Sequence, residues 1–295
     1  MLRFVSYERA GEVHHGRIDD EDGPITELGA GDLLVLLEGA GLAAGSSQSG
    51  REVDPGEVRL LAPIRRPPKL LAVAANYAGH IREGGGTPMD PTRATPRLFL
   101  KPSSAIIGPD DPIVLPSISA RVDWEVELAV VIGRRCRDVA PSAALRVVAG
   151  YMTANDVSAR SIDVDFERDP DTIEPFFDWL AGKWPDGFAP LGPYLVPAGE
   201  VDDPQDLELR LDVNGTTHQQ GSTAEMVFGA AQLISFASSF MTLEPGDVIE
   251  TGTTAGCGVA TGTFLRPGDV MTASVGGLGE LRNRVVSQTA RGPRE

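Results

Sequence analysis

The sequence predicts an α+β protein that is rich in β-strands and carries only a few helices. Glycine and proline supply 34 and 23 of the 295 residues, and so many turn-forming residues favour short strands and loops over a helical bundle. Hydrophobic residues make up 41% of the chain and aromatic residues 6%, and the hydrophobic share is typical of a globular protein. The expected strands and helices do not alternate regularly, so a doubly wound α/β fold is not predicted.

Residues 1–65 are predicted to form a small N-terminal α+β domain, and residues 66–295 a larger domain. The boundary is placed at the cluster of Pro63, Pro67 and Pro68, because proline resists both helices and central strands. The elements expected in the smaller domain are strands at 4–7 and 11–13 and a helix at 32–42.

The larger domain is predicted to consist mainly of strands. Asn214-Gly215 follows an alternating apolar and polar run, which indicates a β-hairpin. Ser222 and Glu225 form a capping box, and apolar residues at helical spacing follow, so a core helix is expected from there to about residue 241. The other expected elements are a helix at 76–83 and strands at 69–74, 97–100, 125–132, 147–152, 207–213, 248–251, 270–275 and 284–286.

The charge of the chain excludes several classes of partner. Lysine and arginine number 26 against 42 aspartate and glutamate residues, which gives a net charge of −16. Such an acidic surface repels nucleic acids and anionic lipid, so neither is expected as a partner. Cys136 and Cys257 form no CxxC or Cys/His pattern, so no disulfide framework or zinc site is predicted. No signal peptide or membrane span is expected, and a cytoplasmic protein is predicted.

Two carboxylates on one expected strand suggest a metal site. Glu125 and Glu127 lie at positions i and i+2, so their side chains share a face, roughly 7 Å apart. Asp156, where the next strand ends, is a candidate third ligand. Oxygen ligands would favour Mg²⁺, Mn²⁺ or Ca²⁺ over zinc. The alternatives are solvated carboxylates on a strand edge and an Asx-capped turn at Asp156.

His80 and Glu83 are candidates for acid–base chemistry. At positions i and i+3 they share one helical face, and a carboxylate that accepts from one imidazole nitrogen leaves the other free to take a proton from water. The glycines 84–86 follow at once and suit a closing lid. The alternative is an ordinary ion pair at a surface helix end. His218 has no nearby carboxylate in the sequence and is interpreted as a surface residue.

Candidate anion-binding groups lie elsewhere in the chain. Lys183 stands in a stiff Gly/Pro segment, and Arg160 follows Asp156 by four residues, although most such side chains are simply solvated. Near the end of the chain, three glycines among hydroxyl residues offer backbone N–H groups and the Thr253 hydroxyl to a carboxylate. The glycine spacing does not match a dinucleotide-binding loop.

Together these segments resemble the fumarylacetoacetate hydrolase family from about residue 69 to residue 286. The order and spacing of the pieces carry the resemblance more than any one of them. The matching segments are Asn76-Tyr77 with His80 and Glu83, Lys101-Pro102, 106–109, 123–129, Asn155-Asp156, 158–160, Gly182-Lys183, 250–253, Gly268-Asp269 and 277–279.

The resemblance implies a mixed β-roll or β-sandwich catalytic domain, a small N-terminal domain and a homodimer. It implies Mg²⁺ or Mn²⁺ on three carboxylates, a dyad that activates water, and two cations that stabilise oxyanions on an anionic small-molecule substrate. These roles fall on Glu125, Glu127 and Asp156, on His80 and Glu83, and on Lys183 and Arg160. The candidate substrate-binding residues are Tyr77, Lys101, Arg160, Asp163 and Thr253.

Departures from the family pattern keep the reaction open. The family often has Ala-Arg-Asp-(Leu/Ile)-Gln after the metal aspartate, whereas this chain has Ser161 and Asp163 at the third and fifth positions. An ionised Asp163 cannot donate a hydrogen bond as glutamine does. The expected activity is hydrolysis of a carbon–carbon bond in a 1,3-dicarbonyl acid. The alternatives are decarboxylation, tautomerisation or hydration of a 2-keto acid, and a non-catalytic binding protein of the same fold.

Overall fold

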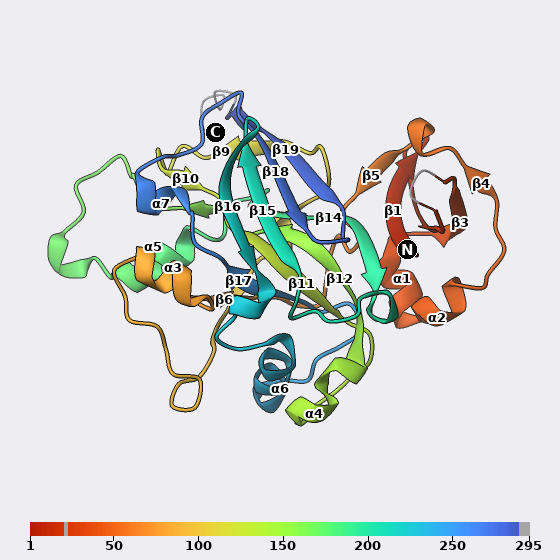
Figure 1. Ribbon diagram of the computed structural model, residues 1–295. Coiled ribbons are helices and arrows are strands. Elements are labelled where there is room, and N and C mark those ends of the chain that lie inside the picture. The colour runs from red at the N-terminus through yellow and green to blue at the C-terminus, as the bar shows by residue number, and fades with distance from the viewer. Residues whose placement is uncertain (21–22, 289–295) are drawn as a thin grey trace.

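The computed structural model describes residues 1–20 and 23–288, and a 12-stranded mixed sheet runs through this part of the chain (Figure 1). The main path through the sheet is β4-β3-β2-β1-β14-β12-β11-β17-β6-β7, with β5 beside β1 and β8 beside β14. These strands are β1 (Arg3–Arg9), β2 (Glu12–Ile18), β3 (Ile25–Ala30), β4 (Glu52–Val53), β5 (Arg59–Leu61), β6 (Leu70–Ala74), β7 (Arg97–Lys101), β8 (Ile106–Ile107), β11 (Val126–Ile132), β12 (Val148–Asn155), β14 (Ala189–Pro197) and β17 (Val248–Thr253).

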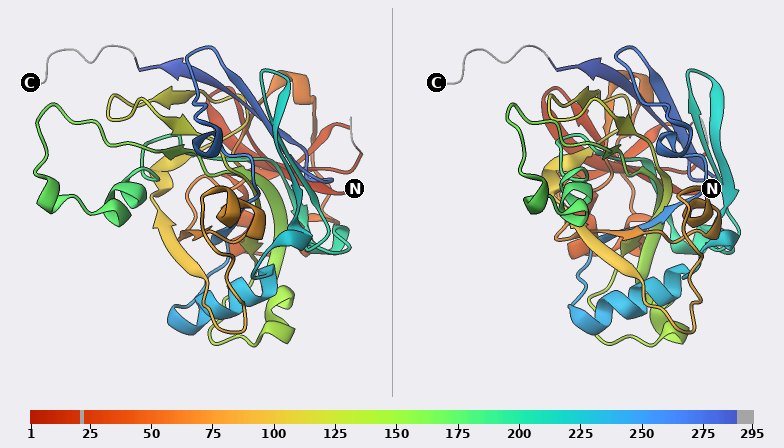
Figure 2. Two further views of the ribbon diagram at one scale, coloured as in Figure 1. Left: turned by 60° about the vertical axis from the view of Figure 1, so that its left-hand side comes forward. Right: turned by 90° about the vertical axis from the view of Figure 1, so that its left-hand side faces the viewer.

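A second sheet of five strands lies across β11 and β12 (Figures 1 and 2). Its order is β16-β15-β18-β19-β9, and the predicted Asn214-Gly215 turn joins β15 to β16. A two-stranded ladder completes the strands of the described residues. The bounds are β9 (Ile113–Leu115), β15 (Glu208–Val213), β16 (Thr216–Ser222), β18 (Val270–Val275) and β19 (Glu280–Ser287), with β10 (Val122–Asp123) and β13 (Ser158–Ala159) in the ladder.

The core explains why β11 is buried on both faces. Val126 and Leu128 pack in one apolar cluster with Leu211 of the second sheet. Ala129 and Val131 point the other way, into a second cluster. Since successive side chains of a strand alternate between faces, a strand between two apolar layers can keep polar groups only where they are specifically paired. Together, the two large sheets and the few short helices confirm the β-rich α+β fold that was predicted from the sequence.

The N-terminal segment shares both sheet and core with the rest of the chain. β1 is hydrogen-bonded to β14 in antiparallel register, with Phe4 opposite Leu195. Phe4 and Leu33 pack in the same cluster as Ala129 of β11. The division at residue 65 stays a prediction, and the last part of the proposed 66–295 domain, 289–295, lies outside the described residues.

The predicted helices differ from the observed ones at their ends. The capping box at Ser222 is present, but it caps a single 3₁₀ turn, Thr223–Glu225, because Met226 returns to an extended ψ of 137°. The core helix therefore begins later than predicted, after Gly229. The helix expected at 32–42 ends at Glu38, where Gly39 is the C-cap, and Gly41, with a φ of 76°, precedes a second short helix. The α-helices are α1 (Leu33–Glu38), α2 (Leu42–Gly45), α3 (Ala78–Glu83), α4 (Pro141–Ala144), α5 (Pro175–Ala181), α6 (Ala230–Phe240) and α7 (Gly258–Thr261).

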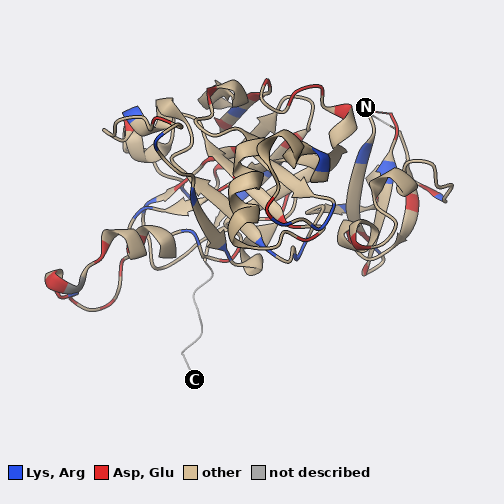
Figure 3. Ribbon diagram, turned by 90° about the horizontal axis from the view of Figure 1, so that it is seen from below, with Lys and Arg blue, Asp and Glu red and all other residues tan. Residues whose placement is uncertain are grey.

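The segment between β13 and α5 extends away from the body of the protein (Figure 2). Acidic residues are frequent along it, as the red positions on the projecting loop show (Figure 3). Large apolar side chains are also exposed, namely Phe166 on this segment and Phe176 and Phe177 at the start of α5. Among the described residues, no helix has the length and apolar character needed to cross a membrane.

Candidate active site

Three carboxylates converge where β11 begins and β12 ends. Val126 lies opposite Asn155 in the antiparallel ladder, so Glu125 and Asp156 face each other just beyond it. The amide of Asp156 donates to the carbonyl of Glu125 at 2.9 Å. Carboxylate oxygens of Glu125, Glu127 and Asp156 all lie within 4.8 Å of one another, and the three side chains are buried. The sequence-predicted trio is thus brought together.

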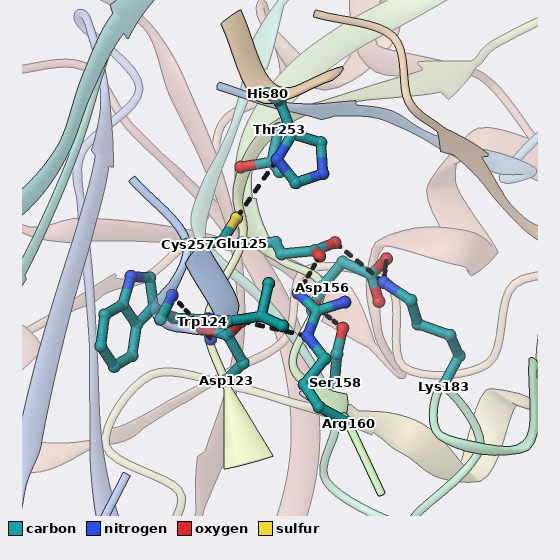
Figure 4. A network of polar contacts seen from close by, with 12 residues as sticks. His80, Asp123, Trp124, Glu125, Asp156, Ser158, Arg160, Lys183, Thr253 and Cys257 are labelled. Carbon is teal, nitrogen blue, oxygen red and sulfur yellow. Dashed lines mark hydrogen bonds and ion pairs between the residues drawn. The ribbon is translucent and has the colours of Figure 1, made fainter. Parts of the chain in front are cut away.

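Buried cations neutralise two of these carboxylates (Figure 4). The Lys183 ammonium donates to Glu125 at 2.8 Å and to Asp156 at 2.6 Å. Arg160 also donates to Glu125, and Lys101 to Asp156. Burial opposes ionisation of Glu125, but the charges of Lys183 and Arg160 outweigh it and hold the pKa of this carboxyl below its usual range. Burial also opposes the charge of Lys183, but Asp156 and Glu125 raise its pKa.

Glu127 receives no such cation. Its carboxylate accepts the Gly252 amide at 2.6 Å, and no ion pair to it is found within the described residues. Burial, followed by the charges of Asp156, Glu250 and Glu125, raises the pKa of Glu127 well above its usual value. A carboxylate held among other carboxylates in this way is stabilised by a cation, so the donor set fits a divalent ion with oxygen ligands.

A fourth buried carboxyl group, Glu250 on β17, strengthens this conclusion. Both of its oxygens are buried and have no hydrogen-bond partner in the described part of the chain. Burial is the largest cause that raises the pKa of Glu250, to about 8, with Asp156 adding to it and Lys101 opposing it. The carboxyl groups here therefore exceed the cations available to neutralise them.

The predicted dyad is formed. The Nδ1 atom of His80 lies 2.7 Å from Glu83 Oε1, and the other oxygen of Glu83 accepts the Gly256 amide at 2.7 Å. Burial opposes ionisation of Glu83, but the hydrogen bonds from His80 and Gly256 outweigh it and lower the pKa of Glu83. Gly256 has a φ of 105°, and a Cβ there would lie 2.0 Å from the carbonyl oxygen of His218, so only glycine fits.

The sheet explains why this dyad meets the carboxylates. β6 and β17 are parallel neighbours, with Ala72 opposite Glu250. The carboxyl ends of parallel strands lie at the same edge, so α3, which follows β6, meets the loop that follows β17. A cavity of about 350 Å³ opens at this edge. The polar side chains that line it are His80, Arg97, Glu125, Asp156, Arg160, Lys183 and Thr253.

Three of the other residues predicted to contact the substrate, Tyr77, Lys101 and Thr253, are buried. The Lys101 ammonium donates to the carboxylate of Asp156 and, at 2.7 Å, to the Phe188 carbonyl. The Thr253 hydroxyl lines the cavity but donates to the Val126 carbonyl at 2.8 Å, so its proton is not available to a substrate carboxylate. Tyr77 is fully buried, and its hydroxyl has no hydrogen-bond partner among the described residues.

Asp163 is not brought to the cavity. It is exposed, and its carboxylate accepts the Ala120 amide at 3.0 Å and the Ser161 hydroxyl at 3.1 Å. His218, predicted as a surface residue, is only half-exposed because its ring packs edge-on against Trp124 at 4.7 Å.

Sequence reasoning missed three residues of the site. Asp123 is buried and accepts the amides of Gly258 at 2.6 Å and Val259 at 2.8 Å, and it pairs with Arg160 at 3.0 Å. Its spacing of two from Glu125 was a usable signal. Glu250 could have been noticed as an acidic residue within an apolar strand. Cys257 gave no spacing signal, because 177 positions separate it from His80, yet its sulfur lies 3.6 Å from His80 Nδ1.

Comparison with known proteins decides the family. The model for the C-terminal domain of fumarylacetoacetate (FAA) hydrolase matches residues 69–286. The chain belongs to the fumarylacetoacetate hydrolase family. A second model, described as Rv2993c-like, N-terminal, matches residues 2–63.

Relatives within the fumarylacetoacetate hydrolase family carry hydrolase and isomerase names. The chain is 39% identical over 287 residues to a 2,4-didehydro-3-deoxy-L-rhamnonate hydrolase of Sphingomonas sp. (strain SKA58), with 96% of each chain covered. Fumarylacetoacetate hydrolase from Exiguobacterium antarcticum superposes with a TM-score of 0.81 at 32% identity, covering 98% of this chain and 100% of that one. A 2-hydroxyhepta-2,4-diene-1,7-dioate isomerase from Mycobacterium marinum superposes with a TM-score of 0.77 at 34% identity and the same coverage. Membership of this enzyme family supports an enzymatic role.

Proposed function

We propose that this protein is a metal-dependent hydrolase that cleaves a carbon–carbon bond in a 1,3-dicarbonyl acid, such as an acylpyruvate or a fumarylacetoacetate-like compound. The main support is the His80–Glu83 pair, hydrogen-bonded at 2.7 Å, at the same cavity as Glu125 and Asp156. Such a reaction requires a base that activates water and an electrophilic centre within reach of one substrate. This cavity offers residues for both.

Glu125, Glu127 and Asp156 would hold Mg²⁺ or Mn²⁺, and Ca²⁺ accepts the same oxygen ligands. When bound, the ion supplies a Lewis acid for the oxygens of the keto acid and for the charge of an enolate. Once these carboxylates are neutralised by an ion, Lys183 and Arg160 can donate their N–H groups to substrate oxygens instead.

The dyad supplies the nucleophile in this proposal. Glu83 holds the Nδ1 proton of His80, so Nε2 accepts a proton from water. The water oxygen bonds to the distal carbonyl carbon, and Lys183 and Arg160 donate to the oxyanion, each contact contributing about 3 kcal/mol. The carbon–carbon bond then breaks, its electron pair forms the enolate of the 2-keto acid, and His80 returns the proton. The products are a carboxylic acid and a 2-keto acid.

One observation favours the alternative, in which a 2-keto acid is decarboxylated, tautomerised or hydrated through an enolate. At the position where family hydrolases often carry glutamine, Asp163 points to Ala120 and Ser161 and offers the cavity no amide donor. The isomerase name of a structural relative is consistent with this alternative.

Product analysis in heavy-oxygen water separates these reactions. The purified protein is incubated with Mg²⁺ or Mn²⁺ and a panel of acylpyruvates, and then with oxaloacetate. Hydrolysis is expected, with one heavy oxygen incorporated into the carboxylic acid product. Loss of carbon dioxide, an isomer of unchanged mass, or addition of one water without bond cleavage would instead establish the alternative. No turnover of any compound would argue against an enzyme of this class.

The cavity also suggests which substrates are preferred. It is also lined by the aromatic side chains of Phe99, Phe176 and Trp179 together with Arg97. Arg97 is exposed, and its guanidinium makes no ion pair with any described residue. An unpaired guanidinium at the rim suits a second carboxylate at the distal end of the substrate.

Replacing Arg97 with glutamine is expected to raise KM for dicarboxylic substrates by about 10-fold or more, because a hydrogen bond to a charged group contributes about 1.5–3 kcal/mol. KM for monocarboxylic analogues should change little. Arg93→Gln, on the preceding exposed loop, is the matched control. Equal losses for both substrate types would refute this role.

The homodimer and the cytoplasmic location stay predictions.

A further inference from the structure

We propose that Cys257, His80 and Glu125 form a second metal site, which binds a soft divalent ion such as Zn²⁺ or Cd²⁺ beside the site for hard cations. The three residues come from three separate segments: the loop after β17, helix α3 and the start of β11. Binding at this site depends only on the ligand atoms that the fold brings together, whereas its effect on catalysis rests on the proposed hydrolase activity.

The distances fit a tetrahedral ion. One ligand atom from each of the three residues lies within 4.8 Å of the others. The Cys257 sulfur and His80 Nδ1 are 3.6 Å apart. With a Zn–S distance of about 2.3 Å and a Zn–N distance of about 2.0–2.1 Å, tetrahedral geometry places sulfur and nitrogen about 3.6 Å apart. The sulfur and the imidazole point toward each other, with Glu125 beside them (Figure 4).

The donor types separate this site from its neighbour. A thiolate and an imidazole favour zinc and cadmium, whereas magnesium and manganese prefer oxygen ligands. The adjacent trio of Glu125, Glu127 and Asp156 offers oxygen only. His80 and Glu125 both line the cavity, so a fourth coordination position is open to water or to a substrate oxygen. Glu125 is the residue common to both sites.

Occupation of this site is incompatible with the dyad. Nδ1 of His80 carries the proton that is shared with Glu83 at 2.7 Å, and the same nitrogen faces the sulfur. For a metal–nitrogen bond to form, the Nδ1 proton moves through solvent to Nε2, and the lone pair left on Nδ1 binds the ion. The thiol proton of Cys257 is released to solvent as the metal–sulfur bond forms. A soft metal ion therefore removes the hydrogen bond that orients His80, and it acts as an inhibitor.

Cadmium titration tests the site without any measurement of activity. In excess Mg²⁺, wild-type protein is expected to develop a cadmium–thiolate charge-transfer band in the ultraviolet that saturates at one equivalent. The band should be lost in Cys257→Ser and retained in Cys136→Ser, since Cys136 is a half-buried thiol outside this cluster. His80→Ala should weaken cadmium binding by about 100-fold, because even outer-shell partners of a metal contribute 10–100-fold.

A band that persists in Cys257→Ser, or one that disappears in Cys136→Ser, would overturn the proposal, as would the absence of any band in the wild type. X-ray absorption at the zinc edge covers the case in which Cys257→Ser fails to fold, because it uses the wild-type protein. One sulfur and one imidazole in the zinc shell are expected, and a shell of oxygen atoms alone would contradict the site.

Discussion

Glu127→Gln is expected to weaken binding of Mg²⁺ and Mn²⁺ strongly and, at the same time, to make the ion-free protein more stable. The side chain is buried, and burial together with Asp156, Glu250 and Glu125 raises its pKa. Because the pKa is raised on folding, the folded protein retains a proton that the unfolded chain releases above about pH 4.3, so this group lowers the free energy of unfolding increasingly as pH rises. Glutamine is neutral at every pH, and its carbonyl can still accept the Gly252 amide.

The measurement is thermal unfolding at neutral pH, with EDTA and with added metal. In EDTA we expect a gain on the order of 1 kcal/mol or more, seen as a rise in Tm of about 2–4 °C. Added Mg²⁺ should stabilise the wild type but not the variant. The affinity of the variant for the metal should be at least about 100-fold lower than that of the wild type. Glu280→Gln, at an exposed strand end, is the control and should leave both quantities unchanged. A variant that binds magnesium normally would exclude Glu127 as a ligand.

His80→Gln is expected to lower kcat by about 100-fold to 10,000-fold while the fold is retained, since general base catalysis contributes this much. The imidazole is the group placed to take a proton from water at the cavity, and its side chain is partly exposed, so the core is not disturbed. Glu83→Gln should have a smaller effect, because the imidazole stays in place. The neutral amide oxygen of glutamine accepts the Nδ1 hydrogen bond more weakly than the carboxylate does.

The double variant distinguishes a dyad from two separate contributions. If Glu83 acts through His80, the loss in kcat for the double variant equals the loss for His80→Gln alone. Losses that multiply would show that Glu83 acts independently, for example by holding the Gly256 amide. His14→Gln, on β2 in the N-terminal segment, is the control for a histidine outside the cavity.

The sequence was sufficient to predict those parts of the site that depend on local spacing. Glu125 and Glu127 share a strand face, and His80 and Glu83 share a helical turn, so two of the main side-chain pairs follow from secondary structure alone. Asp156 was a candidate third carboxylate from its place where a strand ends, and the family resemblance implied the same role for it.

The remaining features depend on contacts between distant segments. The parallel pairing of β6 with β17 places Cys257 beside His80, and nothing in the spacing of the chain indicates it. The fully buried Lys101 and the outward-facing Asp163 were both expected to contact the substrate, because a residue type shows neither its depth nor its direction. The capping box at Ser222 was recognised correctly, but local signals did not reveal that the backbone extends again at Met226.

The antiparallel pairing of β1 with β14 has a consequence for work on shorter versions of the chain. A fragment that starts after the proline cluster would lose Phe4 and Leu33 from the apolar layer behind β11 and would expose backbone N–H and C=O groups of β14. Exposed strand edges recruit other molecules into intermolecular sheets. Such a fragment should therefore aggregate, and the intact protein should melt in one cooperative transition.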